Sequence, residues 1–281
     1  GVAWADTRDA NYEIYFTLVT PDGTPITGEV RLTSSSYPDV APDIEWSGSE
    51  FGIVYSGTFA ADDDVLFSRV DGSGSVVGST VQISVLPMDA AEPSLVWSGS
   101  EWATAWTENP TGASKHVFFA RFDATGTVLD SEVQVSFSTG DSGRPEMVWT
   151  GSEYGIAYHD DRKGASDIYL ARLSATGSTL SEDGLMITGT DATDACLAWA
   201  DGRFGVAWQE PRSGSSPEVL FSALSSVGDP IGSEVLISDS TSYAQYPSAV
   251  WTGSQVAIFW SDGRGGYYHD DIYVDFVDFC D

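Results

Sequence analysis

The chain has 281 residues and carries 12 Lys and Arg against 42 Asp and Glu, a net charge of −30 at pH 7. Such a surface repels phosphate backbones and anionic membranes, which excludes nucleic-acid binding through a basic face. Hydrophobic residues make up 42% of the chain, enough for a folded core. No apolar run approaches the roughly 18 residues of a membrane-spanning helix. The composition therefore predicts a folded, soluble, acidic protein that does not insert into membranes.

A tryptophan followed by a tight turn recurs along the chain with a period of about 51 residues. The five tryptophans are Trp46, Trp97, Trp149, Trp199 and Trp251. Between them the apolar residues alternate or form short runs separated by Gly, Ser and Asp, a pattern that favours strands over helices. We expect these tryptophans to pack between neighbouring repeats.

Each repeat contains four predicted strands, and the chain begins inside a second strand. In the best-preserved repeat they cover 145–149, 154–158, 167–173 and 185–188. The second strands end at Trp4, Tyr55, Trp106, Tyr158, Trp208 and Trp260. A glycine follows each of five third strands, at Gly23, Gly74, Gly126, Gly177 and Gly228. These glycines predict hairpin turns that need a positive φ.

Four antiparallel strands repeated every 51 residues predict an all-β fold, a β-propeller formed as a single domain over residues 1–281. The repeats span approximately 1–42 (partial), 43–93, 94–145, 146–195, 196–247 and 248–281 (partial). Six blades with 22 strands are expected, because the first repeat lacks its first strand and the last lacks its fourth. Five blades, or a longer ring of which this chain is a part, are the alternatives.

The loop after the second strand carries an acid, an arginine two residues later, and a further acid before the third strand. The clearest copy runs from Trp4 through Asp6 and Arg8 to Glu13, and the third repeat is eroded, with Pro110 and His116 at the later positions. This pattern resembles the repeats of extracellular bacterial β-propeller proteins. The resemblance implies a secreted or surface-displayed protein similar to propeller lectin and adhesion modules, and it fixes no ligand.

Three interpretations of the repeated acid and arginine are open. The favoured one is structural, in which each Arg pairs with a carboxylate and fixes the loop. In the second, the acids supply oxygens to Ca²⁺; the candidate ligands are Asp6, Glu13, Asp160, Asp167, Asp262 and Asp271. In the third, the loops bind a glycan through aromatic stacking and hydrogen bonds; the candidates are Trp4, Arg8, Trp106, Arg162, Trp208, Arg212, Trp260, Arg264, Tyr267 and Tyr268.

Two cysteines, Cys196 and Cys280, are expected to form one disulfide if the protein is secreted, and two unpaired thiols are the alternative. No catalytic residues are assigned, since the three histidines show no zinc-site spacing and no nucleophile motif is present. An enzyme would usually break its repeat at one centre, whereas four of the six loops stay similar. The sequence thus predicts an extracellular, non-catalytic module that binds glycans or a surface polymer, with Ca²⁺ as a possible partner. A glycoside-processing enzyme with carboxylates at the channel mouth, or a structural subunit of a surface assembly, is the alternative.

Overall fold

The computed structural model describes residues 1–59, 62–109, 113–181, 184–189, 191–212, 216–238, 243–265 and 271–279. Within these residues the chain forms 22 strands in six antiparallel sheets, with one short 3₁₀ helix, η1 (Gly263–Gly265). The strand number and the six sheets agree with the prediction. We number the sheets 1 to 6 in chain order. Two compact units are present, Gly1–Gln134 and Val135–Asp281, and the expectation of a single domain stays a prediction.

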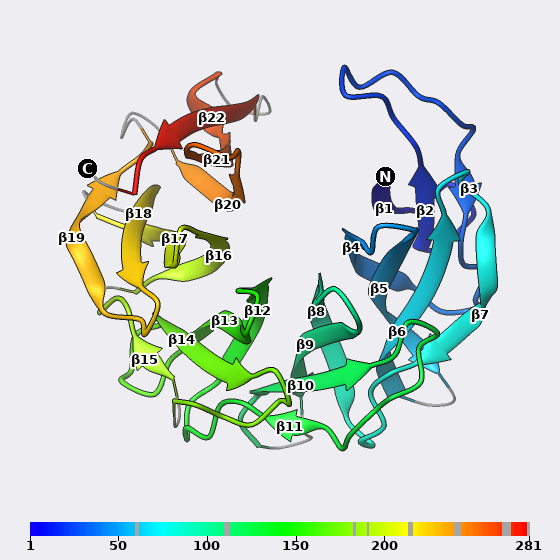
Figure 1. The fold of residues 1–281 in the computed structure, drawn as a ribbon, viewed down its shortest axis with the longest axis horizontal. Coiled ribbons are helices and arrows are strands. Elements are labelled where there is room, and N and C mark those ends of the chain that lie inside the picture. Colours follow the sequence, from blue (N-terminus) through cyan, green and yellow to red (C-terminus); the bar gives the residue numbers. More distant parts are fainter. Residues whose placement is uncertain are drawn as a thin grey trace. The chain divides into compact units, whose positions relative to one another are not determined.

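The first unit contains sheets 1 to 3 (Figure 1). Sheet 1 has β1 (Val2–Asp6), β2 (Glu13–Thr17) and β3 (Val30–Arg31). Sheet 2 has β4 (Asp39–Trp46), β5 (Glu50–Phe59), β6 (Asp62–Asp71) and β7 (Val76–Gln82). Sheet 3 has β8 (Asp89–Trp97), β9 (Trp102–Asn109), β10 (His116–Phe122) and β11 (Val133–Gln134). Each strand pairs with the next along the chain, so every sheet is a simple meander.

The second unit contains sheets 4 to 6. Sheet 4 has β12 (Ser142–Trp149), β13 (Glu153–Asp160), β14 (Asp167–Ser174) and β15 (Leu185–Met186). Sheet 5 has β16 (Thr193–Ala200), β17 (Arg203–Pro211), β18 (Pro217–Ser225) and β19 (Pro230–Leu236). Sheet 6 has β20 (Ala244–Trp251), β21 (Val256–Asp262) and β22 (Asp271–Val277). The first strands β12, β16 and β20 contact one another in succession, so the sheets of this unit stack face to face.

The core lies between consecutive sheets of each unit. In sheets 2 to 5 the second and third strands are largely buried, as in β14, because both of their faces are covered, whereas β22 of sheet 6 is mostly exposed. One cluster joins Val54 and Phe67 of sheet 2 to Trp102 of sheet 3. This burial explains why the middle strands read as apolar runs rather than as alternating patterns.

The repeated turn tryptophans pack only in part as predicted. Trp97 packs on Trp102 of the next strand in its own sheet, with ring centroids 4.6 Å apart, and Trp149 packs on Tyr154 in the same way. Both are only half-buried, and Trp46 is 39% exposed. These rings therefore cover the end of their own hairpin, and Trp97 and Trp199 also pack against the clusters that join neighbouring sheets, as predicted.

The predicted disulfide is not decided by the structure. Cys196 is a buried thiol in β16, while Cys280 lies outside the described residues. The preceding residue, Phe279, belongs to the same apolar cluster as Cys196. The pairing stays a prediction. No helix in the described part of the chain is long and apolar enough to cross a membrane.

Candidate functional site

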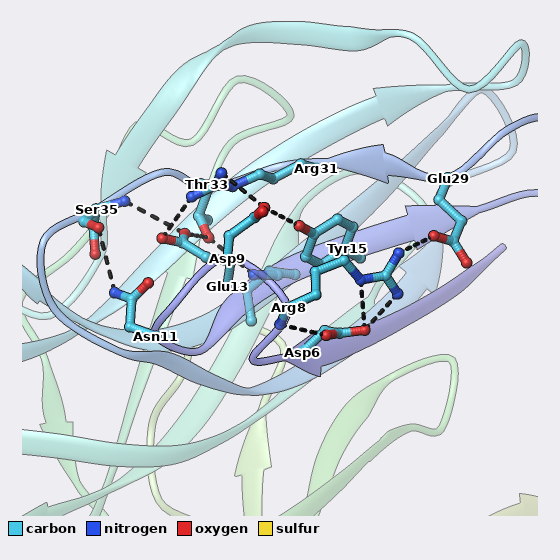
Figure 2. Close-up of polar contacts among 11 residues, drawn as sticks. Asp6, Arg8, Asp9, Asn11, Glu13, Tyr15, Glu29, Arg31, Thr33 and Ser35 are labelled. Atoms are coloured by element: carbon cyan, nitrogen blue, oxygen red, sulfur yellow. Dashed lines mark hydrogen bonds and ion pairs between the residues drawn. The ribbon is translucent and has the colours of Figure 1, made fainter.

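In sheets 1, 4, 5 and 6 the loop after the second strand has the structural role that its sequence favours. In sheet 1 the Arg8 side chain donates to the Asp6 carboxylate and also reaches Glu29, as Figure 2 shows. Asp6 also accepts a hydrogen bond from the backbone N–H of Arg8 at 2.8 Å. These hydrogen bonds lower the pKa of Asp6 to about 2. The guanidinium lies 4.5 Å from the ring centroid of Tyr15, which adds a cation–π contact.

The same arrangement recurs in the second unit. The Arg162 guanidinium donates to both Asp160 oxygens at 2.7 and 2.6 Å, and it lies 4.0 Å from the ring centroid of Tyr169. Asp262 and Arg264 repeat this pair in sheet 6, and Glu210 and Arg212 repeat it in sheet 5. In each of these loops the charge on the acid is balanced by an arginine of the same loop.

The residues predicted to bind a ligand lie mostly in packing positions. Trp106, Trp208 and Trp260 are at most 5% exposed, and each indole N–H donates to the acid two residues later. Their ring faces are covered by protein, so they offer no platform for a sugar in this structure. Trp4 is half-buried and stacks on Tyr15. Tyr267 and Tyr268 lie outside the described residues, and glycan binding by this set stays untested.

The predicted calcium ligands do not gather into one centre. Asp6, Asp160 and Asp262 pair with arginines, and Glu13 is buried against Arg31 and Thr33 at 2.9 and 2.6 Å. Asp167 is buried and Asp271 is exposed at the start of its strand. The described residues contain no group of three or more His, Cys, Asp or Glu placed to hold a metal ion. Calcium binding by these loops has no structural support and stays a prediction.

In sheet 2 the acid of the loop after the second strand is replaced by an acid from the first strand, Asp39. Its loop has Gly57 where other sheets have the acid, and a Cβ at Gly57 would collide with the carboxylate of Asp39 from β4. At the position of Asp39 the other first strands have Ala90, Ser142, Ala192 and Ala244. The acid has therefore moved to the neighbouring strand, and burial raises its pKa. A paired comparison of positions 39 and 57 across the repeats would have revealed this exchange.

The first strands of sheets 2 to 6 each contain a β-bulge. Register shifts interrupt the pairing of β4, β8, β12, β16 and β20 with their next strands. At each bulge one non-glycine residue has a positive φ of 49° to 55°: Ala41, Glu92, Arg144, Asp194 and Tyr246. This backbone is strained for residues with a Cβ, and bulges of this kind often redirect side chains at functional sites. The backbone conformation at the bulge is therefore the same in the five sheets, while each sheet has a different side chain there.

In the second unit an ion pair and several hydrogen bonds connect the residues at the three bulges. Arg144 pairs with Asp194, which accepts a hydrogen bond from Thr193 at 3.0 Å. The amide of Gln209 donates to Thr193 at 3.2 Å and accepts from the backbone N–H of Tyr246 at 2.8 Å. The Asp194 carboxylate at the bulge of β16 thus has Arg144 as its partner.

The first unit has a carboxyl pair directly after its first bulge. Asp43 and Glu45 are two residues apart on β4, so their side chains lie on one face. The Oδ2 atom of Asp43 accepts a hydrogen bond from the N–H of Leu95 in β8 at 2.7 Å, and Oδ1 accepts one from the N–H of Ile44 at 2.8 Å. Asp43 is therefore held between sheets 2 and 3, while Glu45 is exposed.

Burial perturbs the pKa of both carboxyl groups. Burial raises the pKa of Asp43 to about 6, against the opposing effect of its hydrogen bonds. Partial loss of hydration raises the pKa of Glu45, and the charge of Asp43 adds to this. Neither group forms an ion pair with a Lys or Arg in the described part of the chain. The pair therefore retains a proton in mildly acidic solution.

Glu45 also interrupts the repeat. The residue before the turn tryptophan is Val96, Val148, Ala198 or Val250 in the other copies. An apolar residue is expected there because the position faces the next sheet: Glu45 pairs in register with Gly52, where a Cβ would collide with the Trp102 ring. A carboxyl group at this place opposes stability, which is typical of a functional residue. Alignment of the five copies contains this signal, which the sequence interpretation missed.

No protein-family model matches the chain, and no curated protein matches it. Among solved structures, the exo-β-1,3-galactanase of Phanerochaete chrysosporium has a TM-score of 0.55 at 13% identity, covering 94% of this chain and 67% of that one. A thermostable family-43 glycoside hydrolase has a TM-score of 0.54 at 10% identity, covering 87% and 91% of the two chains. The endo-arabinase of Bacteroides thetaiotaomicron has a TM-score of 0.53 at 9% identity, covering 84% and 93%.

At these identities the likeness shows the fold, and the predicted six-sheet β-propeller class is confirmed. The same comparison contradicts two expectations. The sequence favours a non-catalytic recognition module over an enzyme, yet the matching structures are glycoside hydrolases. The comparison favours the enzymatic alternative. The earlier preference rested on the similarity of four loops, and those loops turn out to be structural, so their similarity says nothing against catalysis elsewhere.

Proposed function

We propose that the chain is a glycoside-processing enzyme that hydrolyses a glycan through the carboxyl pair of Asp43 and Glu45. The observation that carries this proposal is the perturbed carboxyl pair without an arginine partner, in which Glu45 stands where the four other copies have Val or Ala. Perturbed carboxyl groups of this kind are the usual means by which glycosidases keep one acid protonated beside an ionised one.

The two residues have different parts in the proposed reaction. Glu45 is exposed and reaches the substrate, so it donates a proton to the leaving glycosidic oxygen as the bond to the sugar carbon breaks. Asp43 has both oxygens engaged by backbone N–H groups and acts through Glu45. When Asp43 is ionised, its negative charge raises the pKa of Glu45, which makes Asp43 a positioning residue. The oxygen of a water molecule then bonds to the sugar carbon, and the proton that this water loses returns to the Glu45 carboxylate, which completes the hydrolysis.

The substrate class is proposed from the solved neighbours. Their names specify an endo-arabinase and an exo-β-1,3-galactanase, so polymers of arabinose and galactose are the first candidates. A neutral polymer also suits a chain of net charge −30, which would repel acidic glycans. The extracellular location that the composition favours is likewise a proposal and accords with a polymeric substrate.

The experiment is a reducing-end assay of the purified chain on arabinan, β-1,3-galactan and their aryl glycosides. We expect release from at least one polymer that is absent from a Glu45→Gln preparation purified in the same way. The variant serves as the control for contaminating hydrolases. Equal release from both preparations, or none from any polymer, would refute the proposed function.

A further inference from the structure

An arginine that balances two carboxylates in other sheets is missing from sheet 3. In sheet 1, Arg8 pairs with Asp6 and with Glu29, and in sheet 5, Arg212 pairs with Glu210 and with Glu234. Both glutamates, at positions 29 and 234, come from the fourth-strand region of the sheet. One guanidinium thus neutralises an acid of the second strand and an acid near the fourth.

Sheet 3 keeps both acids and lacks the cation. Glu108 lies at the position of Asp6, Glu132 at that of Glu29, and Pro110 at that of Arg8. Glu108 is fully buried, with Oε1 accepting from the indole N–H of Trp106 at 2.6 Å. Glu132 accepts from the backbone N–H of Val85 at 2.5 Å. The Oε2 atoms of both glutamates are buried and have no hydrogen-bond partner within the described residues.

The electrostatics agree with a missing positive charge. Burial raises the pKa of Glu108 to about 7, with further contributions from the charges of Glu132, Asp64 and Asp89. Burial also raises the pKa of Glu132. Unpaired buried carboxylates oppose folding, whereas the equivalent acids in sheets 1 and 5 are stabilised by arginine.

We infer that Glu108 and Glu132 form a calcium site at the place that the arginine guanidinium takes in sheets 1 and 5. Carboxylate oxygens are the ligands that Ca²⁺ prefers, and its flexible coordination accepts backbone carbonyls and water for the remaining positions. The two acids supply the charge, so no third acidic ligand is required. The site differs from the loops predicted from the sequence to bind calcium, because Asp6, Asp160, Asp262 and Glu13 of those loops already pair with arginine.

Terbium luminescence tests the site directly, because Tb³⁺ replaces Ca²⁺ and is sensitised by a nearby indole such as that of Trp106. We expect tryptophan-sensitised emission from the wild-type protein that added Ca²⁺ displaces. Glu108→Gln and Glu132→Gln should each lower this emission by at least about fivefold, because each removes half of the ligand charge. Glu210→Gln is the matched control: it removes the equivalent acid in sheet 5, where Arg212 is present, and should leave the emission unchanged.

Removing the arginine from sheet 5 should create a second Tb³⁺ site and so increase the emission. Arg212→Gln exposes Glu210 and Glu234 beside Trp208, whose indole N–H is 2.9 Å from Glu210, and should add a second Tb³⁺ site. Melting temperatures check that each variant is folded; Glu108→Gln removes a buried charge and should melt no lower than the wild type in the absence of metal. Emission that is equal in the wild type and both sheet-3 variants, or that Ca²⁺ does not displace, would overturn the site.

Discussion

Replacing Glu45 with valine is expected to lower kcat for glycan hydrolysis by about 10²- to 10⁴-fold, the usual contribution of a general acid. The fold should be unaffected or slightly more stable, because valine is the residue that three other copies have at this position. It also removes a carboxyl group whose pKa is raised by partial burial. Reducing-end release and thermal unfolding, measured on the same preparation, give both quantities.

The control for this variant is Asp63→Asn, which removes an exposed acid from the same sheet and should leave kcat within twofold, as surface substitutions usually do. A Glu45→Val protein that unfolds normally and keeps full activity would show that the proton donor lies elsewhere. The combination of retained stability and lost activity separates a catalytic residue from one that only supports the fold.

Asp160→Asn is expected to destabilise the protein by about 3 to 5 kcal/mol, the cost of breaking a buried ion pair. Asp160 is fully buried and accepts from Arg162, Ser138 and Ser142, so the variant leaves a guanidinium without its anion. Denaturant unfolding at pH 7 measures the loss. Asp201→Asn is the control, since Asp201 is exposed in a turn at φ 52°, which asparagine also adopts.

The lowered pKa of Asp160 also predicts that the stability of the protein depends on pH. Burial raises the pKa of Asp160, but the hydrogen bonds of Arg162, Ser142 and Ser138 outweigh it and hold the pKa at about 2. A lowered pKa stabilises the folded state above the ordinary value near 4, and this stabilisation is lost as the pH falls from there toward 2. The wild type should lose this increment on acidification and the Asp160→Asn variant should not. Parallel losses in both proteins would show that Asp160 is not the group responsible.

The architecture followed from periodicity because each repeat is a separate hairpin meander with its own turn residues. The prediction placed strands at 154–158 and 167–173, and the structure has Glu153–Asp160 and Asp167–Ser174. The fourth strand is shorter than predicted, Leu185–Met186 instead of 185–188, because only Tyr169 and Leu170 of the third strand pair with it. Edge strands of this kind are defined by few hydrogen bonds, which a sequence pattern locates poorly.

The candidate site could be read from the sequence only in part. The acid–arginine pairs were predicted because both partners lie within one loop, two residues apart. The Asp43–Glu45 pair was missed because its significance depends on the contact of Asp43 with β8. The replacement of the loop acid by Asp39 was missed because it depends on contact between β4 and Gly57 of the next strand. The acid–arginine pairs recur from repeat to repeat, whereas the proposed catalytic residues lie where the repeat changes.

The most direct test of the proposed chemistry is the pH dependence of kcat/KM for the wild-type chain on the polymer that it hydrolyses. A proton donor must be protonated to act, and the pKa of Glu45 is raised, so activity should fall with rising pH over a range above that of an ordinary carboxyl group. Asp43→Asn removes the charge that raises the pKa of Glu45 and should move this decline to lower pH. A kcat/KM that stays constant or rises between pH 6 and about 9, where an exposed carboxyl group is ionised, would contradict acid catalysis by this pair.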